Sequence, residues 1–240
     1  MKRRTLGRKG PTVSALGLGC MGRSEFYGPS DEGHSPATLD AVLERGIDFL
    51  DTADIYGHGA NEELLGGFLK DRRHRVTIAT KFGILRSADP DARPVDCSPE
   101  YVSAACEASM RRLGVETIDL YYLHRRNADV PIEGTVGAMV RLVDEGNVRA
   151  IGLCEVAPDT IRRAHATHPV TAIQSEYSLR SRDPEKEVLP LLTELGIGFV
   201  PYSPLRRGAL TGKLQSADDL PAVDFHRTIP VTHRSALAES

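Results

Sequence analysis

Short apolar runs rich in β-branched residues alternate along the chain with amphipathic segments of helical length. The runs predict buried strands at 14–21, 47–53, 76–81, 118–124, 148–154, 171–177 and 196–204. The segments between them predict helices near 36–45, 61–70, 99–113, 132–145, 158–166 and 185–195. Strands that alternate with helices predict an α/β protein with an all-parallel sheet, either doubly wound or closed into a barrel.

Residues typical of helix ends support these boundaries. Ser98 stands where an N-cap is expected, and Pro99 follows it at the first helical position. Gly114 follows the same predicted helix as a C-cap, and Gly46 and Gly146 end two others. The sequence therefore gives both the type and the approximate limits of the helices.

Polar residues stand at the carboxyl ends of many predicted strands. They are Asp51, Lys81, His124, Cys154, Glu155, Gln174, Tyr202 and Ser203. In a parallel barrel such positions converge on one mouth, whereas a doubly wound sheet gathers them beside one glycine-rich turn. GLGCMG at 17–22 formally matches a dinucleotide-binding fingerprint, but loop-like residues follow where its helix would have to begin. The pattern favours a barrel, with the polar loop 87–100 placed to lie over its mouth.

Composition narrows the class of protein. The chain has 240 residues, of which 40% are hydrophobic and 26% charged, as in ordinary soluble globular proteins. A net charge of -3, from 33 acidic and 30 basic residues, gives no electrostatic case for nucleic acid or an anionic membrane as partner. The sequence lacks a signal-peptide pattern and an apolar membrane span, so we expect a cytoplasmic protein. Its four scattered cysteines predict neither a disulfide framework nor a zinc site.

Asp51, Tyr56, Lys81 and His124 form the candidate catalytic group. A tyrosine hydroxyl, whose pKa is ordinarily about 10, becomes a proton donor near neutral pH when a cation lies beside it. The residue types predict Tyr56 as the acid, Lys81 as the cation and Asp51 as its anchor. Taken singly, Asp51 and Lys81 also fit a structural ion pair.

The longer motifs around these positions resemble the aldo-keto reductase family. They are LGLGCMG, GIDFLDTADIYGHGANEELLG, ATKFG, IDLYYLHR, GNVRAIGLCEV, AIQSEYSL and PYSPLRRGALTGKL, in family order. The resemblance implies one domain over residues 1–240 with a (β/α)8 TIM-type barrel, and a tetrad of Asp51, Tyr56, Lys81 and His124. It also implies metal-free reduction of an aldehyde or ketone, with hydride from NADPH and a proton from Tyr56 while His124 orients the carbonyl.

The resemblance further implies contacts to the cofactor. The matching positions are Cys154, Glu155, Gln174, Tyr202, Ser203, Leu205 and Arg207. Gln174 corresponds to the residue that bonds the nicotinamide carboxamide, and Tyr202 to the aromatic that stacks under its ring. Cys154 replaces the usual serine, and a thiol is a weaker hydrogen-bond donor than a hydroxyl. Arg206 replaces a common glycine and either adds charge for a phosphate or crowds the loop.

The chain departs from the family pattern in the segment 215–240. Family members continue well beyond GALTGKL, whereas this segment reads as shortened or divergent. Within it, Thr232 and Arg234 stand in an order similar to a family segment that contacts NADPH, as expected if a deletion had brought that segment forward. If about seven βα units are all that form, the barrel keeps an open edge that favours association with another chain or with the tail.

Three classes of function fit these observations. The first is an NADPH-dependent carbonyl reductase that acts on a small molecule, and the second is a non-catalytic or regulatory barrel with impaired cofactor binding. The third, a metal-dependent hydrolase, lacks a second strand-end histidine or an HxH pair. A purely structural barrel needs no lysine and carboxylate aimed at one tyrosine, which favours the reductase.

Overall fold

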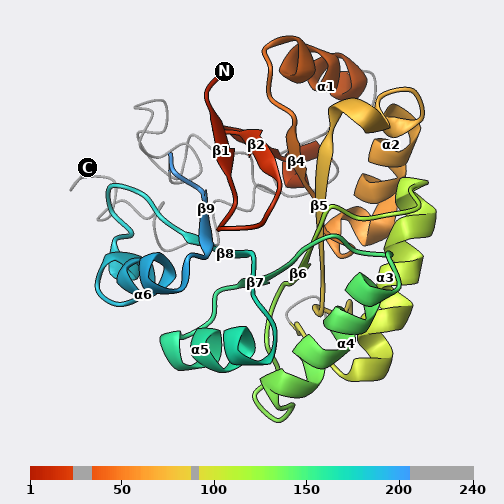
Figure 1. The fold of residues 1–240 in the computed structure, drawn as a ribbon. Helices are drawn as coiled ribbons and strands as arrows, with labels where there is room; N and C mark the ends of the chain where they lie inside the picture. Colours follow the sequence, from red (N-terminus) through yellow and green to blue (C-terminus); the bar gives the residue numbers. More distant parts are fainter. Residues whose placement is uncertain (24–33, 88–91, 206–240) are drawn as a thin grey trace.

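Residues 1–23, 34–87 and 92–205 are described by the computed structural model of this chain, shown in Figure 1. Within them a sheet of seven parallel strands follows the order β3-β4-β5-β6-β7-β8-β9. The strands are β3 (Gly17–Gly19), β4 (Phe49–Asp51), β5 (Thr77–Phe82), β6 (Leu120–Leu123), β7 (Ile151–Cys154), β8 (Ala172–Glu176) and β9 (Gly198–Tyr202). Because the spatial order equals the chain order, the sheet curls into a nearly closed barrel and confirms the predicted TIM-type fold.

Helices connect successive strands and surround the sheet (Figure 1). They are α1 (His34–Glu44), α2 (Ala60–Leu69), α3 (Pro99–Leu113), α4 (Ile132–Asp144), α5 (Pro158–Thr167) and α6 (Val188–Leu195). All six coincide closely with predicted segments, although α6 begins later than expected because a 3-10 turn at Asp183–Glu185 precedes it. None of the helices in the described ranges is long and apolar enough to cross a membrane.

The ends of α3 are as the sequence predicts. The Ser98 hydroxyl accepts a hydrogen bond from the Tyr101 backbone nitrogen at 3.3 Å, and Pro99 occupies the first turn. Gly114 ends the helix at a φ of 62°, in the left-handed region that glycine adopts without strain. Local sequence therefore marks both limits of this helix.

A hairpin at the N-terminus was not predicted. It consists of β1 (Arg3–Thr5) paired antiparallel with β2 (Thr12–Ser14). Leu6 and Val13 are buried in a cluster that includes Phe49, Leu120 and Ala172, the first residues of β4, β6 and β8. The hairpin therefore covers the end of the barrel opposite the carboxyl ends of its strands. Strands of three residues carry too little periodicity to be read from sequence.

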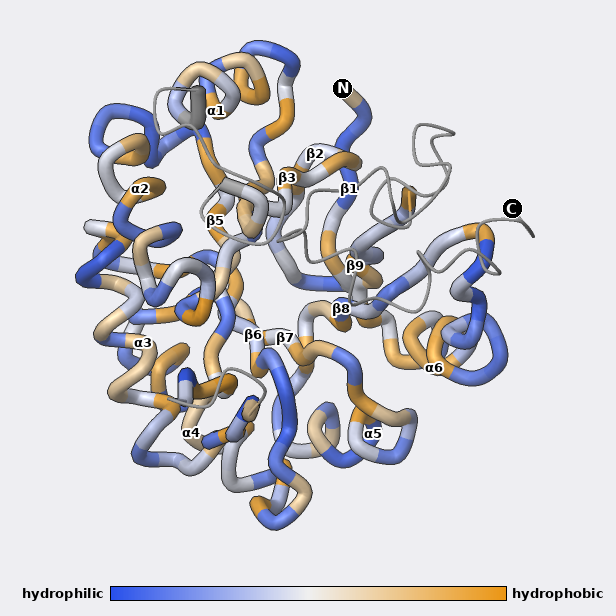
Figure 2. The backbone as a smooth tube through the Cα atoms, turned by 180° about the vertical axis from the view of Figure 1, so that it is seen from behind, coloured by the Kyte–Doolittle hydropathy of each residue, from blue (hydrophilic) through white to orange (hydrophobic). Residues whose placement is uncertain are grey.

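The apolar core has two parts. The larger cluster fills the space between the sheet and the helices, and the smaller one lies inside the barrel with Tyr122 and Leu120 among its members. Figure 2 shows hydrophobic and hydrophilic residues alternating along the helices, as expected where one helix face covers the sheet. The outer edges of β3 and β9 have no strand partner in the described part of the chain. The predicted divergent segment 215–240 lies outside the described residues.

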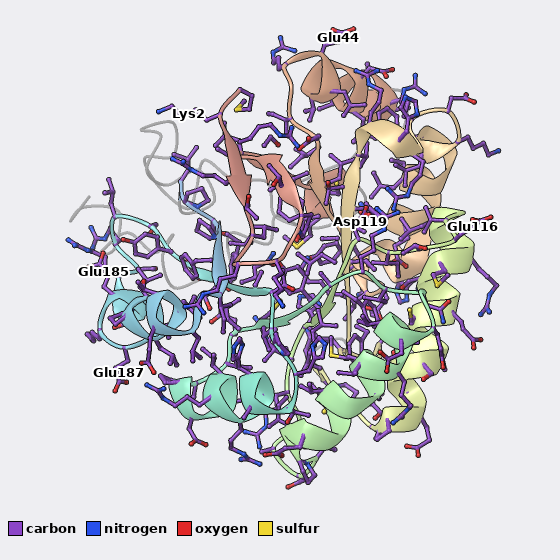
Figure 3. The ribbon with its side chains drawn as sticks, viewed as in Figure 1. Lys2, Glu44, Glu116, Asp119, Glu185 and Glu187 are labelled. Carbon is purple, nitrogen blue, oxygen red and sulfur yellow. The ribbon has the colours of Figure 1, made fainter. Side chains whose placement is uncertain are left out.

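Asp119 carries a buried charge near the start of β6. Figure 3 places it toward the middle of the molecule, whereas Glu44 and Glu116 lie at the periphery. Its carboxylate accepts a hydrogen bond from the Ile78 backbone nitrogen at 2.8 Å and pairs with Arg73 at 2.9 Å. This contact joins the beginnings of β5 and β6, and so supports the register of the two strands.

Two adjacent glycines of α2 provide a matched test of helix packing. A Cβ at Gly66 would overlap the backbone carbonyl oxygen of Arg112 on α3, whereas a Cβ at Gly67 would have no neighbour within 4 Å. We expect Gly66→Ala to lower the free energy of unfolding by about 1–3 kcal/mol through overpacking. Gly67→Ala should raise it by about 0.5–1 kcal/mol through helix propensity. Urea denaturation of both variants measures this, and equal effects would contradict the close packing of α2 on α3.

Candidate active site

A cavity of about 570 Å³ opens at the carboxyl ends of the strands. Among the residues predicted from sequence, those that line it are Asp51, Tyr56, His124, Cys154, Gln174, Tyr202 and Ser203. Lys81 lies beneath its wall, while Leu205 is 58% exposed and, like Glu155, does not line the cavity. Arg206, Arg207, Thr232 and Arg234 lie outside the described residues. The structure therefore brings the tetrad and part of the expected cofactor set to one place.

Lys81 holds the tetrad together. Its side chain is 1% exposed, and Nζ donates to Asp51 Oδ1, to the Thr52 carbonyl oxygen at 2.7 Å and to the Tyr56 hydroxyl at 3.4 Å. An ammonium group has three N–H donors, and these contacts use all of them. The position of Lys81 is thus specified by three partners from the end of β4 and the loop that follows it.

The charge of Lys81 is stable in this position. Burial alone would lower the pKa of its ammonium group, but the negative charge of Asp51 and the other neighbours raise it above the ordinary value. Lys81 is therefore a cation throughout the neutral range. The ion pair between Lys81 and Asp51 is mostly shielded from water. This shielding strengthens the electrostatic effect of the Lys81 charge on Tyr56.

The pKa of Tyr56 differs from the sequence-based expectation. Burial raises it above its ordinary value, and the adjacent positive charge of Lys81 opposes this rise without overcoming it. The direction of the Lys81 effect is as expected, but the net shift is upward, because the burial of a side chain is not visible in the sequence. Tyr56 is consequently a protonated hydroxyl at neutral pH, which is the form a proton donor requires.

His124 faces Tyr56 edge to face, with ring centroids 5.9 Å apart and an interplanar angle of 84°. Burial, followed by the charges of Lys81 and Arg125, lowers the pKa of its imidazole well below the ordinary value. His124 is therefore neutral, and its buried Nδ1 has no hydrogen-bond partner among the described residues. A neutral imidazole beside a tyrosine hydroxyl can bond a carbonyl oxygen without adding charge.

Gln174 connects the tetrad to the opposite side of the barrel. Its Nε2 donates to Asp51 Oδ2 at 2.8 Å, so that both carboxylate oxygens of Asp51 are engaged. The carboxamide of Gln174 also carries an oxygen, which is a hydrogen-bond acceptor. Gln174 is thus placed at the cavity as predicted, and it also fixes the orientation of Asp51.

The ends of β7 and β9 carry unusual backbone geometry. Glu155 and Ser203 have φ values of 51° and 52°, in the left-handed region that non-glycine residues rarely adopt. Glu155 also raises the pKa of Tyr202 through a hydrogen bond, after the larger effect of burial. Cys154 next to it is buried, and burial raises the pKa of its thiol to about 12. Cys154 is therefore uncharged and unsuited to act as a nucleophile.

A second layer of buried polar residues lies behind the tetrad. Asn61 at the start of α2 accepts a hydrogen bond from the Thr52 hydroxyl at 2.6 Å, and Thr52 in turn supplies the carbonyl that holds Lys81. Glu62, which is fully buried, accepts from the Thr80 hydroxyl at 2.5 Å and pairs with Arg112 at 2.7 Å. The first turn of α2 therefore anchors the backbone on both sides of Lys81.

Sequence reasoning missed several residues of the cavity. They are Gly19, Met21, Gly22, Ile55, Ile84, Arg93, Val95 and Arg125. Most of them stand in loops, where no periodic pattern marks a side chain as inward-facing. The described residues contain no group of three or more His, Cys, Asp or Glu side chains that could hold a metal ion.

Comparison with known proteins agrees with this geometry. The model of the aldo/keto reductase family matches residues 15–230. The chain belongs to the aldo/keto reductase family. The chain is 53% identical to "Probable aldo-keto reductase 1" of Glycine max over 210 residues. This match covers 87% of this chain and 60% of that protein. The chain thus spans less than two thirds of the length of this curated family member.

Solved structures of the same family have the same fold. The holo form of aldo-keto reductase AKR11C1 from Bacillus halodurans is 37% identical with a TM-score of 0.78, covering 92% of this chain and 71% of that one. The glycerol dehydrogenase AKR11B4 from Gluconobacter oxydans is 27% identical with a TM-score of 0.87, covering 99% of this chain and 73% of that one. The barrel is therefore the fold of these family structures.

Glu62 and Glu63 allow a matched test of the polar layer. In Glu62→Gln the charge-assisted bond to Arg112 loses its negative partner, whereas Glu63 is exposed on the same helix. We expect Glu62→Gln to lower the free energy of unfolding by about 2 kcal/mol. Glu63→Gln should stay within about 0.5 kcal/mol of the parent chain. Denaturant titration measures both, and equal stabilities would show that the Glu62–Arg112 pair contributes nothing.

Asp54 predicts a pH dependence of stability. Burial, followed by the charge of Glu62, raises the pKa of its carboxyl from 3.8 to about 7. Between these values the unfolded chain releases a proton that the folded chain keeps, so Asp54 stabilises the fold at low pH and this stabilisation is lost as pH rises. We expect the free energy of unfolding of Asp54→Asn, relative to that of the parent chain, to be higher at pH 8 than at pH 4 by on the order of 2 kcal/mol. Denaturation at both pH values tests this, and a constant difference would contradict it.

Proposed function

We propose that the chain reduces an aldehyde or ketone to an alcohol with a nicotinamide cofactor of the NADPH type. The observation that carries this proposal is the contact of a buried, charged Lys81 with both Asp51 and the Tyr56 hydroxyl at the wall of a cavity. A structural ion pair would stabilise the barrel without a tyrosine hydroxyl at its exposed side. The arrangement instead suits proton donation to an oxygen in the cavity.

Tyr56 has the central role in this proposal. Its hydroxyl donates a proton to the carbonyl oxygen as negative charge develops there. The phenolate left behind is stabilised by the Lys81 ammonium group at 3.4 Å, whose charge is stable because Asp51 holds it. Burial makes Tyr56 a weak acid in the resting protein, so the proton leaves only when an acceptor of sufficient basicity forms beside it.

His124 orients the substrate oxygen. Its imidazole is neutral and lies edge to face with Tyr56, which places a second hydrogen-bonding group beside the same oxygen. Two donors that converge on one oxygen stabilise charge where it develops. Because His124 stays neutral, it does not compete with Tyr56 as the proton source at neutral pH.

The residues of the cavity fit a nicotinamide group. Tyr202 presents an aromatic ring and Gln174 a carboxamide, and both line the same cavity as Tyr56. The neutral imidazole of His124 lines the same cavity and has hydrogen-bonding nitrogens to offer a ligand. When bound, the cofactor would supply the hydride. The holo form of AKR11C1 and the glycerol dehydrogenase AKR11B4 support this proposal by family likeness.

Further contacts to the cofactor are proposed on resemblance. Cys154, Glu155, Ser203 and Leu205 would lie along the nicotinamide and pyrophosphate, and Arg207, Thr232 and Arg234 would bind phosphate charge. One domain over residues 1–240 is proposed on the same ground.

Substitution of Tyr56 tests the proposal. We expect Tyr56→Phe to lower kcat for simple aldehydes by at least about 100-fold, because the proton donor is lost, while the affinity for NADPH persists. Lys81→Met should be similarly severe, since the phenolate would lose its neighbouring cation. Steady-state kinetics, with NADPH binding followed by fluorescence, measures these effects.

Tyr101→Phe serves as the matched control, because Tyr101 lies on α3 and does not line the cavity. It should leave kcat close to that of the parent chain, and circular dichroism reports whether each variant folds. Undiminished turnover in Tyr56→Phe would overturn the assigned role. Failure of the folded parent chain to bind NADPH would instead favour a non-catalytic barrel.

A further inference from the structure

Two arginines line the cavity from the loops that follow β5 and β6. Arg93 lies in the first loop and Arg125 directly follows His124 in the second. Neither has a part in the proton donation described above. Their presence in the same cavity as the tetrad therefore calls for a ligand group that guanidinium ions bind.

Hydrogen bonds join the two described ends of the loop that carries Arg93. The Leu85 nitrogen donates to the Pro94 oxygen at 2.8 Å, and the Asp96 nitrogen donates to the Gly83 oxygen at 2.9 Å. Ile84 and Val95 form an antiparallel bridge between these two bonds. The backbone next to Arg93 is thus anchored to the residues that follow β5, and Arg93 lines the cavity from there.

Neither arginine has an acidic partner among the described residues. Arg125 donates to the neighbouring His124 carbonyl oxygen at 3.0 Å, and neither it nor Arg93 forms an ion pair within the described ranges. By contrast, the part-buried Arg73 and Arg112 each pair with a buried carboxylate. Arg73 and Arg112 thus have carboxylate partners that the exposed Arg93 and the part-buried Arg125 lack within the described ranges.

The cavity offers these arginines no carboxylate of its own. Asp51 is the one acidic residue among the described residues that line it, and its two oxygens are already bonded to Lys81 and Gln174. The positive charge of Arg125 reaches the interior, since it contributes to the lowered pKa of His124 and opposes the raised pKa of Cys154. The electrostatic field in this part of the cavity therefore favours an anion.

The remaining neighbours on this side are apolar. Met21, Ile55, Ile84 and Val95 line the cavity from the loops after β3, β4 and β5. The described residues proposed to contact the cofactor stand instead in or just after β7, β8 and β9. The side of the cavity next to Arg93 and Arg125 thus combines apolar walls with two planar groups that bind carboxylates in a forked geometry.

We propose that Arg93 and Arg125 form a subsite for a carboxylate group of the carbonyl substrate, whose remaining body is apolar. The substrate class is thus an aldehyde or ketone that carries a carboxylate at the far end of an apolar segment. That the bound molecule is a substrate rests on the proposed function. The binding of a carboxylate at the two arginines does not depend on turnover.

The test compares 4-carboxybenzaldehyde with its uncharged methyl ester, methyl 4-formylbenzoate. We expect kcat/KM at saturating NADPH to favour the acid by roughly 10-fold or more in the parent chain, because charge-assisted hydrogen bonds are stronger than neutral ones. Arg93→Gln and Arg125→Gln should each remove most of this preference through a higher KM for the acid. Arg125→Lys should restore part of it, since it keeps the charge but loses the forked geometry.

Arg162→Gln is the matched control, because Arg162 pairs with Glu194 at the surface of α5 and does not line the cavity. It should leave the preference for the acid unchanged. The dissociation constant of NADPH, measured for every variant, shows whether an arginine acts on the cofactor. A weaker NADPH complex with an unaltered preference for the acid would overturn the subsite.

A second measurement separates this inference from the proposed function. Calorimetry compares the binding of 4-(hydroxymethyl)benzoate and its methyl ester to the parent chain and to both glutamine variants. An arginine-dependent preference for the acid without turnover of either aldehyde would support the subsite and overturn the reductase. Turnover of both aldehydes with no arginine-dependent preference would overturn the subsite alone.

Discussion

The buried ammonium group of Lys81 is the charge on which the mouth of the barrel depends. Removing such a group from water is costly unless every donor finds an acceptor. The acceptors are Asp51, the Thr52 carbonyl and the Tyr56 hydroxyl, which come from a single stretch of chain at and after β4. Gln174 then holds the second oxygen of Asp51 from the opposite side of the barrel. One charge thereby determines the relative positions of β4, β5 and β8.

The polar layer behind Lys81 fixes the position of the loop that follows β4. The first turn of α2 places Asn61 and Glu62 against Thr52 and Thr80, which lie beside Asp51 and Lys81 in the sequence. These bonds are buried, and each would leave an unsatisfied polar group if it were broken. The geometry of the tetrad therefore depends on α2, β4 and β5 together. It is not set only by the residues that contact Lys81.

The sequence predicted what is periodic or local and missed what depends on tertiary contact. The strand and helix order, the caps at Ser98 and Gly114 and the convergence of the tetrad followed from pattern and spacing. The hairpin β1–β2 escaped because three-residue strands carry little periodicity. Arg93 and Arg125 were missed as cavity residues because no periodic pattern in a loop shows which side chains face inward. The net pKa of Tyr56 depends on its burial, which no local pattern reveals.

The N-terminal hairpin has a consequence for the order in which the chain folds. Its turn contacts the start of β9, where the Arg8 nitrogen donates to the Gly196 oxygen at 3.0 Å and Gly7 lies against Gly198. These partners are synthesised long after the hairpin leaves the ribosome, and contacts between distant parts of a chain form slowly. The contacts that join the hairpin to β9 therefore form only after the other strands of the described barrel have been synthesised.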